Sequence, residues 1–299
     1  MGLPAFAVPA SFLGIASRDT HAPVAIAGIP FDIGTTNRSG ARFGPHAIRH
    51  ASRMLTDGAH PKSWVDPTTR AISDVGDFEI ALGDISKTLA LIETQAAPYA
   101  HLITLGGEHG ITLPLLRALA KKNLTPPALI HFDAHVDTWP DSSGQEFGHG
   151  QPFYHAIREN LIDPSRSVQI GIRSPVQREV WDWTLEQGLT IITAEEFHDI
   201  GVAATAARIH TCVGAAPAYL SFDIDCLDPA FAPGTGTPEI GGLASWQAQA
   251  IFRRLSGIDF VGMDLVEVAP AYDVSEITSL AGATLVWEYL ALLVQQNKI

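Results

Sequence analysis

The chain has 299 residues, of which 46% are hydrophobic and 17% charged, and its formal net charge is −13. This composition supplies enough apolar residues for a large core and excludes a wholly disordered chain. The acidic balance argues against a nucleic-acid partner and mildly favours a cationic ligand.

The cysteines and the two ends of the chain bear on its location. Cys212 and Cys226 form no CxxC pair, so we expect no disulfide framework and a reducing cytoplasm. Met1–Ser17 contains no Lys or Arg and so lacks the basic head of a secretory signal. The apolar stretch Thr284–Val294 is interrupted by Glu288 and is too short to span a bilayer. These features predict a soluble cytoplasmic protein with no membrane partner.

Short apolar runs alternate with amphipathic stretches along the chain. The apolar runs predict strands at Val24–Gly28, His101–Leu105, Ala128–Phe132, Ser167–Gly171, Thr190–Thr193, Ala218–Phe222 and Phe260–Met263. The stretches between them predict helices at Pro45–Met54, Ser86–Thr94, Thr112–Lys121, Val176–Glu186, Ala203–Cys212, Ser245–Leu255 and Glu276–Leu293. Most strand runs are continuously apolar, as in a sheet covered on both faces. This order predicts one α/β domain over residues 1–299, with three layers (α/β/α) and a mostly parallel central sheet.

Three long stretches rich in glycine and polar residues follow predicted strands. They are Gly28–Gly44, Thr138–Gly150 and Cys226–Gly242. Open α/β sheets carry their sites in loops at the carboxyl ends of strands, so we expect a site among these loops.

The motif HFDAHVD (His131–Asp137) follows the apolar run Pro127–Ile130 directly. Side chains alternate between faces in an extended chain, so Asp133, His135 and Asp137 are predicted to project to one side. Three potential metal ligands on one face at a strand end predict half of a metal site.

Two further motifs extend this site. Asp223 and Asp225 follow another apolar run and are predicted to share a face, and His109 follows a glycine pair that permits close backbone approach. The four carboxylates of these motifs would repel one another at neighbouring strand ends unless cations were present. Two divalent cations balance them, with the imidazoles as neutral donors. The absence of thiolate suits Mn²⁺ and admits Ni²⁺, Co²⁺ or Zn²⁺.

These motifs resemble those of the ureohydrolase family, which comprises arginases, agmatinases and related guanidino-acid hydrolases. The resemblance covers nearly the whole chain, from GIPFDIGTTNRSGARFGPHAIR at Gly28–Arg49 to VGMDLVEVAPAYDVSEIT at Val261–Thr278. The run SFDIDCLDPAFAPGTGTPEIGG (Ser221–Gly242) is especially similar to bacterial agmatinases. One departure is Glu108, where many members have Asp, and we expect it to have little consequence.

The resemblance implies an arginase-like fold with a two-manganese cluster. Its ligands would be His109, Asp133, His135, Asp137, Asp223 and Asp225. In the family pattern Asp133 and Asp223 bridge the ions, and His109 and Asp137 complete the shell of one of them.

Catalytic roles follow from the same resemblance. His149 matches a loop histidine that shuttles protons, and Glu267 matches a carboxylate that grips the guanidinium. Guanidinium is a poor electrophile, so neutral water would not attack it usefully, whereas a hydroxide bridging two metals is available at neutral pH. We therefore predict His149, Asp137 and Glu267 as catalytic residues in the hydrolysis of a guanidino compound to urea and an amine.

The substrate favoured by the sequence is agmatine, which would yield putrescine and place the enzyme in polyamine biosynthesis. Trp139 stands where arginases use an Asn to bind the α-substituents of arginine, and Ser174 begins a loop that lacks their acid. Asp141 and Glu146 make the Thr138–Gly150 loop suited to a cationic tail.

Other substrates remain open. Asn37, Arg38 and Arg42 lie in the early loop and would suit the carboxylate of guanidinobutyrate or guanidinopropionate, although Arg42 would serve equally as a structural ion-pair partner. Trp139 is predicted either to wall a methylene channel or to pack the loop. The predicted substrate-binding residues are Glu267, Trp139, Glu146, Asn37 and Arg38.

Two alternatives compete with a ureohydrolase. A deacetylase of this fold would use one zinc, and the six-ligand set argues against it. A catalytically silent partner subunit would keep the fold but lose a ligand, and none is missing from the sequence. The resemblance also implies a homo-oligomer, either a trimer or a hexamer.

Overall fold

The computed structural model describes residues 11–55, 59–122, 125–141 and 144–299. Over these residues eight parallel strands form one sheet in the order β2-β1-β3-β8-β7-β4-β5-β6. The strands are β1 (Val24–Ile29), β2 (Ile72–Asp77), β3 (Leu102–Gly106), β4 (Ala128–Phe132), β5 (Val168–Ile172), β6 (Thr190–Thr193), β7 (Pro217–Asp223) and β8 (Asp259–Val266). The predicted α/β fold with a central parallel sheet is confirmed.

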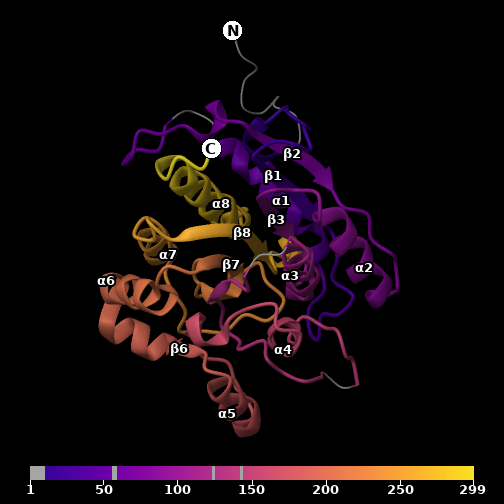
Figure 1. The fold of residues 1–299 in the computed structure, drawn as a ribbon, viewed down its shortest axis with the longest axis vertical. Coiled ribbons are helices and arrows are strands. Elements are labelled where there is room, and N and C mark those ends of the chain that lie inside the picture. The colour runs from indigo at the N-terminus through magenta and orange to yellow at the C-terminus, as the bar shows by residue number, and fades with distance from the viewer. Residues whose placement is uncertain (1–10, 56–58, 123–124, 142–143) are drawn as a thin grey trace.

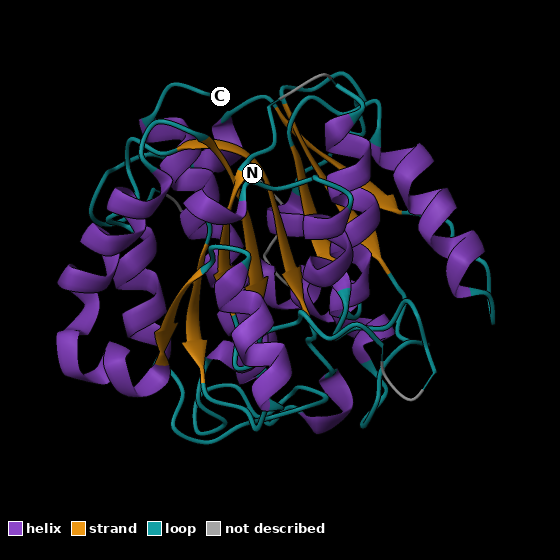
Figure 2. Ribbon diagram, turned by 60° about the horizontal axis from the view of Figure 1, so that its bottom comes forward, coloured by secondary structure: helices purple, strands orange, loops and turns teal. Residues whose placement is uncertain are grey.

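Helices cover both faces of this sheet (Figures 1 and 2). They are α1 (Gly44–Ser52), α2 (Ile85–Ala96), α3 (Thr112–Ala120), α4 (Pro152–Arg158), α5 (Arg178–Glu186), α6 (Ala194–Val213), α7 (Ser245–Phe252) and α8 (Ile277–Gln295). Helices α1, α6, α7 and α8 pack against one face, and α2, α3 and α4 against the other. This is the three-layer arrangement that the alternating pattern predicts.

Strand β4 shows why its sequence is continuously apolar. Ile130 and Phe132 join the hydrophobic cluster beneath α6 and α7, whereas Leu129 joins the cluster beneath α3 and α4. All five residues of the strand are buried. Burying each large apolar side chain contributes about 1.5–3 kcal/mol to the free energy of folding, so the side chains on both faces of β4 stabilise its place in the centre of the sheet.

Three elements differ from the prediction. Strand β2 was not predicted, because its sequence ISDVGD is not an apolar run and it lies at the edge of the sheet. Helix α4 was also missed, since seven residues give little periodic signal. Helix α6 begins at Ala194, before the predicted start at Ala203, with a break at Gly201 (φ 74°).

Helix α8 contains the apolar stretch that the sequence analysis judged too short for a membrane span. Among the described residues it is the one helix long and apolar enough for that, and 78% of its most apolar window is buried in the protein. Glu288, the polar interruption, accepts a hydrogen bond from Arg253 Nε at 2.9 Å and lies 2.9 Å from His60 Nε2. The helix therefore has the environment of a core helix. Residues 1–10, part of the start predicted to lack a secretory leader, lie outside the described ranges.

A buried ion pair joins α1 to the edge strand β2 and provides a stability prediction. Arg49 donates from Nε and Nη2 to the two carboxylate oxygens of Asp74 at 2.8 and 2.9 Å. Arg49→Met removes the bidentate partner of the buried Asp74 charge and leaves it only the half-exposed Arg18, whose Nη1 lies 3.5 Å from Asp74 Oδ1. We therefore expect a loss of about 3 kcal/mol in the free energy of unfolding. Urea denaturation measures this. Arg178→Met, which breaks an exposed pair with Asp182, serves as the control and should leave the midpoint unchanged. Equal shifts of the urea midpoint in the two variants would contradict a stabilising role of the buried Arg49–Asp74 pair.

Candidate active site

The predicted site residues meet at the carboxyl ends of four central strands. Strands β3, β8, β7 and β4 are neighbours in the sheet, and their arrowheads point to the loops at the lower edge of Figure 2. His109 follows β3, Glu267 follows β8, Asp223 ends β7 and Asp133 follows β4. Segments far apart in the sequence thus place their polar side chains together.

His109 is the centre of one group of ligands. Its Nδ1 lies 3.1 Å from Asp133 Oδ2, 2.9 Å from Asp137 Oδ2 and 3.3 Å from Asp223 Oδ2. This nitrogen is buried and makes no well-directed hydrogen bond within the described part of the chain. Octahedral ligands at bonds of about 2.1 Å stand about 3 Å apart, so the spacing fits a shared cation.

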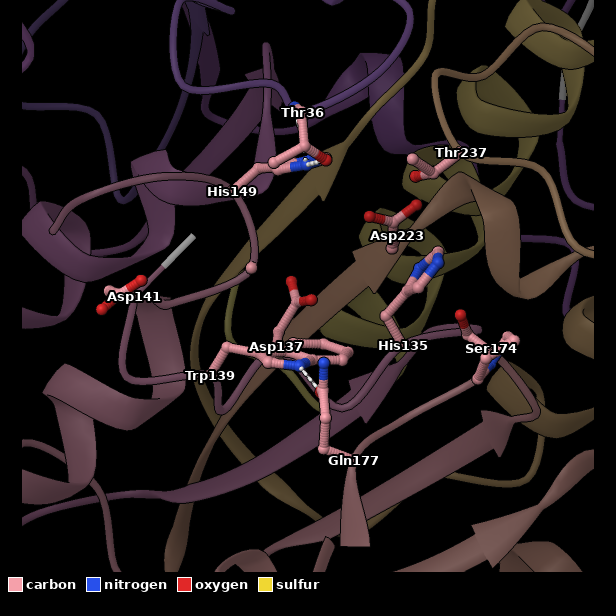
Figure 3. Close-up of a pocket in the computed structure, with 12 residues that line it drawn as sticks. Thr36, His135, Asp137, Trp139, Asp141, His149, Ser174, Gln177, Asp223 and Thr237 are labelled. Carbon is pink, nitrogen blue, oxygen red and sulfur yellow. Dashed lines mark hydrogen bonds between the residues drawn. The ribbon is translucent and has the colours of Figure 1, made fainter. Parts of the chain in front are cut away.

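His135 is the centre of an adjoining group. Its Nδ1 lies 3.3 Å from Asp133 Oδ1 and 3.2 Å from Asp225 Oδ2. Asp133 therefore presents one carboxylate oxygen to each group, as a bridging ligand does. The structure brings together all six side chains that the sequence predicted as ligands, and Figure 3 shows Asp137, His135 and Asp223 directed toward one space.

The metal-ligand side chains come together because the backbone bends after the strand ends. The sequence predicted instead an extended chain whose alternating side chains would share one face. Strand β4 ends at Phe132, and Asp133 Oδ1 accepts a hydrogen bond from the backbone N–H of His135 at 2.6 Å. Asp137 has a φ of 49°. The period-two argument for these residues is therefore wrong in its geometry, because side-chain capping turns the chain as soon as the strand ends.

The same device acts after β7. Asp223 Oδ1 accepts a hydrogen bond from the N–H of Asp225 at 2.9 Å, and a 3-10 turn covers Ile224–Cys226. An aspartate that caps its own turn with one oxygen keeps the other for the site.

The electrostatics of the cluster favour bound positive charge. Burial lowers the pKa of His109, and the carboxylates of Asp133, Asp137 and Asp223 outweigh burial and hold that pKa well above its usual value. Burial and the neighbouring negative charges raise the pKa of Asp223 well above its usual range. In the metal-free protein, protons thus accumulate on this cluster to offset its carboxylates. The donor set fits two divalent cations, which would supply that charge instead.

A buried hydrogen-bond chain fixes the orientation of His109. Its Nε2 lies 2.8 Å from Ser221 Oγ, which donates to Asp264 Oδ1 at 2.6 Å. Ser221 can then only accept from Nε2–H, so Nδ1 is the nitrogen that faces the carboxylates. Nδ1 carries a second proton in the metal-free protein and would release that proton to bind a cation. The sequence analysis missed Asp264, although an acid inside the apolar run of β8 was a usable signal.

His131 is a second residue that the sequence analysis assigned no role. It is fully buried, and its Nε2 lies 2.7 Å from Asp133 Oδ2. Its Nδ1 lies 3.1 Å from Gln169 Nε2, an amide donor, so Nε2 carries the proton and donates to Asp133. His131 therefore orients the carboxylate that both ligand groups share.

Glu267 lies beside the cluster with one carboxylate oxygen unused. Its φ of 64° is rare for a residue other than glycine and marks a constrained position. Oε1 accepts a hydrogen bond from the backbone N–H of His109 at 2.9 Å. Oε2 is buried and has no hydrogen-bond partner among the residues that the structure describes. A buried free carboxylate oxygen is a strong acceptor for an incoming N–H group.

His149 has a partner for either protonation state. Its Nδ1 lies 3.0 Å from Glu267 Oε1, and its Nε2 lies 2.8 Å from the hydroxyl and 3.1 Å from the backbone nitrogen of Thr36. The Thr36 hydroxyl can accept from a protonated Nε2, and the backbone N–H can donate to a bare one. Burial lowers the pKa of His149, and the charge of Glu267 more than reverses this, giving about 9.

Glu108 has a larger structural role than the sequence analysis expected. It is fully buried, and its Oε2 accepts a hydrogen bond from the backbone N–H of Gly34 at 2.6 Å. A Cβ at Gly34 would stand 2.4 Å from Glu108 Oε1 and 3.0 Å from Gly148 Cα, so any larger residue would displace the Glu108 side chain. Burial raises the pKa of Glu108 to about 8. The hydrogen bond tethers the loop that carries Thr36 to the segment that follows β3.

A cleft of about 380 Å³ opens over the cluster. Its lining residues are Thr36, His135, Asp137, Trp139, Asp141, His149, Gly150, Ser174, Pro175, Gln177, Asp223 and Thr237 (Figure 3). Trp139, predicted to bind the substrate, is therefore in the lining.

The other residues predicted for the substrate tail lie elsewhere. Glu146 and Asn37 are exposed, and neither belongs to the cleft lining. The Arg38 guanidinium lies over the Tyr272 ring, 5.1 Å from its centroid. Arg42 forms an ion pair with buried Asp32. The structure does not bring Glu146, Asn37 or Arg38 to the cleft, and their contact with substrate stays a prediction.

Comparison with known proteins agrees with this geometry. The model of the arginase family matches residues 22–291. The chain is 48% identical to an agmatinase of Chromobacterium violaceum over 93% of this chain and 86% of the relative. It is 44% identical to a guanidinopropionase of Pseudomonas aeruginosa over 99% of this chain and 91% of the relative.

A solved structure gives the same fold. The crystal structure of a hypothetical agmatinase from Burkholderia thailandensis superposes with a TM-score of 0.91 at 45% identity, covering 98% of this chain and 93% of that one.

Proposed function

Because the chain belongs to the arginase family, we propose that it hydrolyses a linear guanidino compound to urea and an amine, with agmatine as the main substrate. The observation that carries this proposal is the unpaired Oε2 of Glu267, buried beside the cation-binding cluster. A planar guanidinium presents paired N–H donors, which a carboxylate can bind in a fork. Glu267 would thereby hold the guanidinium carbon over the cluster.

Different residues of the site have different roles in the reaction. Bound divalent cations lower the pKa of water and so make a nucleophile available at neutral pH. Glu267 neutralises and orients the guanidinium during attack on its central carbon. The bond from that carbon to the tail nitrogen breaks, and His149 donates a proton to the departing amine. Urea and a primary amine remain.

The charge of the cleft supports a cationic tail. Among the described residues, the lining includes the carboxylates of Asp137, Asp141 and Asp223 and no Lys or Arg. The ammonium of agmatine would be attracted to Asp141, which stands apart from the cluster in Figure 3. The carboxylate tail of a guanidino acid would meet no Lys or Arg among these lining residues, and His135 and His149 already face carboxylates of the site.

A guanidino acid such as 3-guanidinopropionate is the second candidate. The likeness to a guanidinopropionase extends over 99% of the chain. Gln177 also lines the cleft, and its amide would offer N–H donors to a carboxylate.

We further propose two Mn²⁺ ions per subunit, a cytoplasmic location and a homo-oligomer, either trimeric or hexameric. The oxygen and imidazole donors without thiolate support Mn²⁺ and also admit Ni²⁺, Co²⁺ or Zn²⁺. The scarcity of cysteine supports the reducing compartment. Agmatine hydrolysis would assign the enzyme to putrescine and polyamine biosynthesis.

Urea release from parallel substrates tests the proposal. Protein loaded with Mn²⁺ is assayed with agmatine, arginine, 4-guanidinobutyrate, 3-guanidinopropionate and guanidine. We expect the wild-type protein to have its highest kcat/KM with agmatine. In Asp141→Asn, kcat/KM should decrease roughly three-fold for agmatine alone, which is the effect of losing a partly exposed ion pair. Asp182→Asn, on the surface of α5, is the control.

The pattern of activity separates the alternatives. A preference for a guanidino acid would change the proposed substrate and leave the proposed reaction, hydrolysis of a guanidino compound to urea and an amine, unchanged. No urea from any substrate, with Mn²⁺, Ni²⁺ or Co²⁺, would favour the silent partner subunit.

A further inference from the structure

Trp139 forms one wall of the cleft beside the cluster. In Figure 3 its indole lies between Asp137 and Gln177 and extends toward His135. A substrate whose guanidinium sits over the cluster can run its tail along this ring, because Trp139 and the cluster residues line the same cleft. The flat carbon face of an indole suits methylene groups.

The indole is held by a hydrogen bond at its outer edge. Trp139 Nε1 donates to Gln177 Oε1 at 2.6 Å. An indole nitrogen can only donate, so the amide oxygen of Gln177 is the atom that faces it. Gln177 occupies the N-cap position of α5 without using its side chain as the cap. That side chain is therefore available to fix the ring.

The backbone of Trp139 is anchored independently of its side chain. Its N–H donates to the carbonyl of Gly150 at 3.2 Å, and the hydroxyl of Thr138 lies 2.5 Å from that of Thr184 on α5. The loop would thus keep its place without Gln177, and the ring rotamer alone would be released.

We propose that the Trp139–Gln177 hydrogen bond sets the tail length that the cleft accepts, with Gln177 as a positioning residue for the indole wall. The inference rests on the proposed hydrolysis of linear guanidino compounds and names a residue that selects among them. A fixed wall matches one tail length, and a ring free to rotate accommodates several at lower affinity.

The test compares agmatine with its homologues one methylene shorter and one longer. Gln177→Leu removes the acceptor, and Trp139→Phe removes the donor while keeping an aromatic face. Each variant should raise KM for the preferred homologue by roughly five-fold, leave kcat within about two-fold and narrow the kcat/KM ratios between homologues. The double variant should resemble the single ones, because both remove the same bond.

Two controls separate positioning from damage to the fold. Gln177→Glu keeps an acceptor for the indole and should retain the wild-type length ratios. Gln187→Leu, at the other end of α5, should change neither KM nor the ratios.

Unchanged length ratios in Gln177→Leu, or additive effects in the double variant, would overturn the inference. If agmatine proves not to be a substrate, the same ratios are measured on guanidino acids of increasing length. This comparison distinguishes a wrong substrate assignment from a wrong role of the Trp139–Gln177 hydrogen bond in selecting the tail length.

Discussion

Asp223→Asn is expected to abolish urea release while making the metal-free protein more stable to unfolding. The carboxylate faces His109 Nδ1 at 3.3 Å, in the group of atoms that would hold a cation. Losing its charge should lower cation affinity and reduce kcat by roughly a thousand-fold, about 4 kcal/mol in the activation barrier.

The gain in stability has the same electrostatic origin. Burial and the charges of Asp225 and Asp133 raise the pKa of Asp223, which means that its ionised form is unfavourable in the folded protein without cations. Asparagine removes that charge, and its amide oxygen can still accept the hydrogen bond from Asp225 N. We expect Tm to rise by a few degrees in metal-free protein.

Thermal unfolding with and without Mn²⁺ measures both effects. Wild type should gain stability on adding Mn²⁺, because a ligand that binds the folded state stabilises it. Asp223→Asn should lose most of this gain. A variant that keeps the full Mn²⁺ shift, or near-normal urea release, would show that Asp223 is not a ligand.

Glu267→Gln is expected to remove activity and to change how stability depends on pH. The neutral amide keeps an oxygen for His109 N–H but loses the charge that would pair with guanidinium. We expect kcat/KM to decrease by roughly a thousand-fold, since a charge-assisted contact in a buried site is lost.

The pH effect acts through His149, whose pKa is about 9 because Glu267 outweighs the effect of burial. A histidine whose folded pKa exceeds its unfolded value contributes stability below about pH 6.5 and loses it as pH rises through 9. The full contribution is about 3 kcal/mol. Removing the Glu267 charge lowers the His149 pKa, so this part of the pH dependence should largely disappear.

Urea denaturation of the metal-free proteins between pH 6 and 9 measures the difference. Other histidines in the cluster also lose protons as pH rises, and subtracting the variant curve from the wild-type curve isolates the effect of Glu267. Parallel curves for the two proteins would contradict the coupling between Glu267 and His149.

The sequence predicted the central strands because most of them are continuous runs of apolar residues. Strand β4 is buried on both faces and is therefore an apolar run, whereas β2 at the sheet edge contains the polar residues Ser73, Asp74 and Asp77 and gives no such signal. The seven predicted strands correspond to strands of the sheet with shifts of a few residues at their ends.

The metal ligands were predictable because His and Asp cluster in short motifs at strand ends. Their geometry was not, since Asp133 and Asp223 each bend the chain by accepting a hydrogen bond from the backbone two residues later. Gln177 escaped notice for a different reason. Its contact with Trp139 spans 38 residues and depends on where α5 begins, which no local pattern specifies.

Diffraction from crystals grown with Mn²⁺, recorded near the manganese absorption edge, tests the central claim most directly. The account predicts two anomalous peaks per subunit, one among His109, Asp133, Asp137 and Asp223 and one beside His135 and Asp225, with Asp133 contacting both. A single peak, or peaks outside these six residues, would contradict a two-cation guanidino hydrolase site.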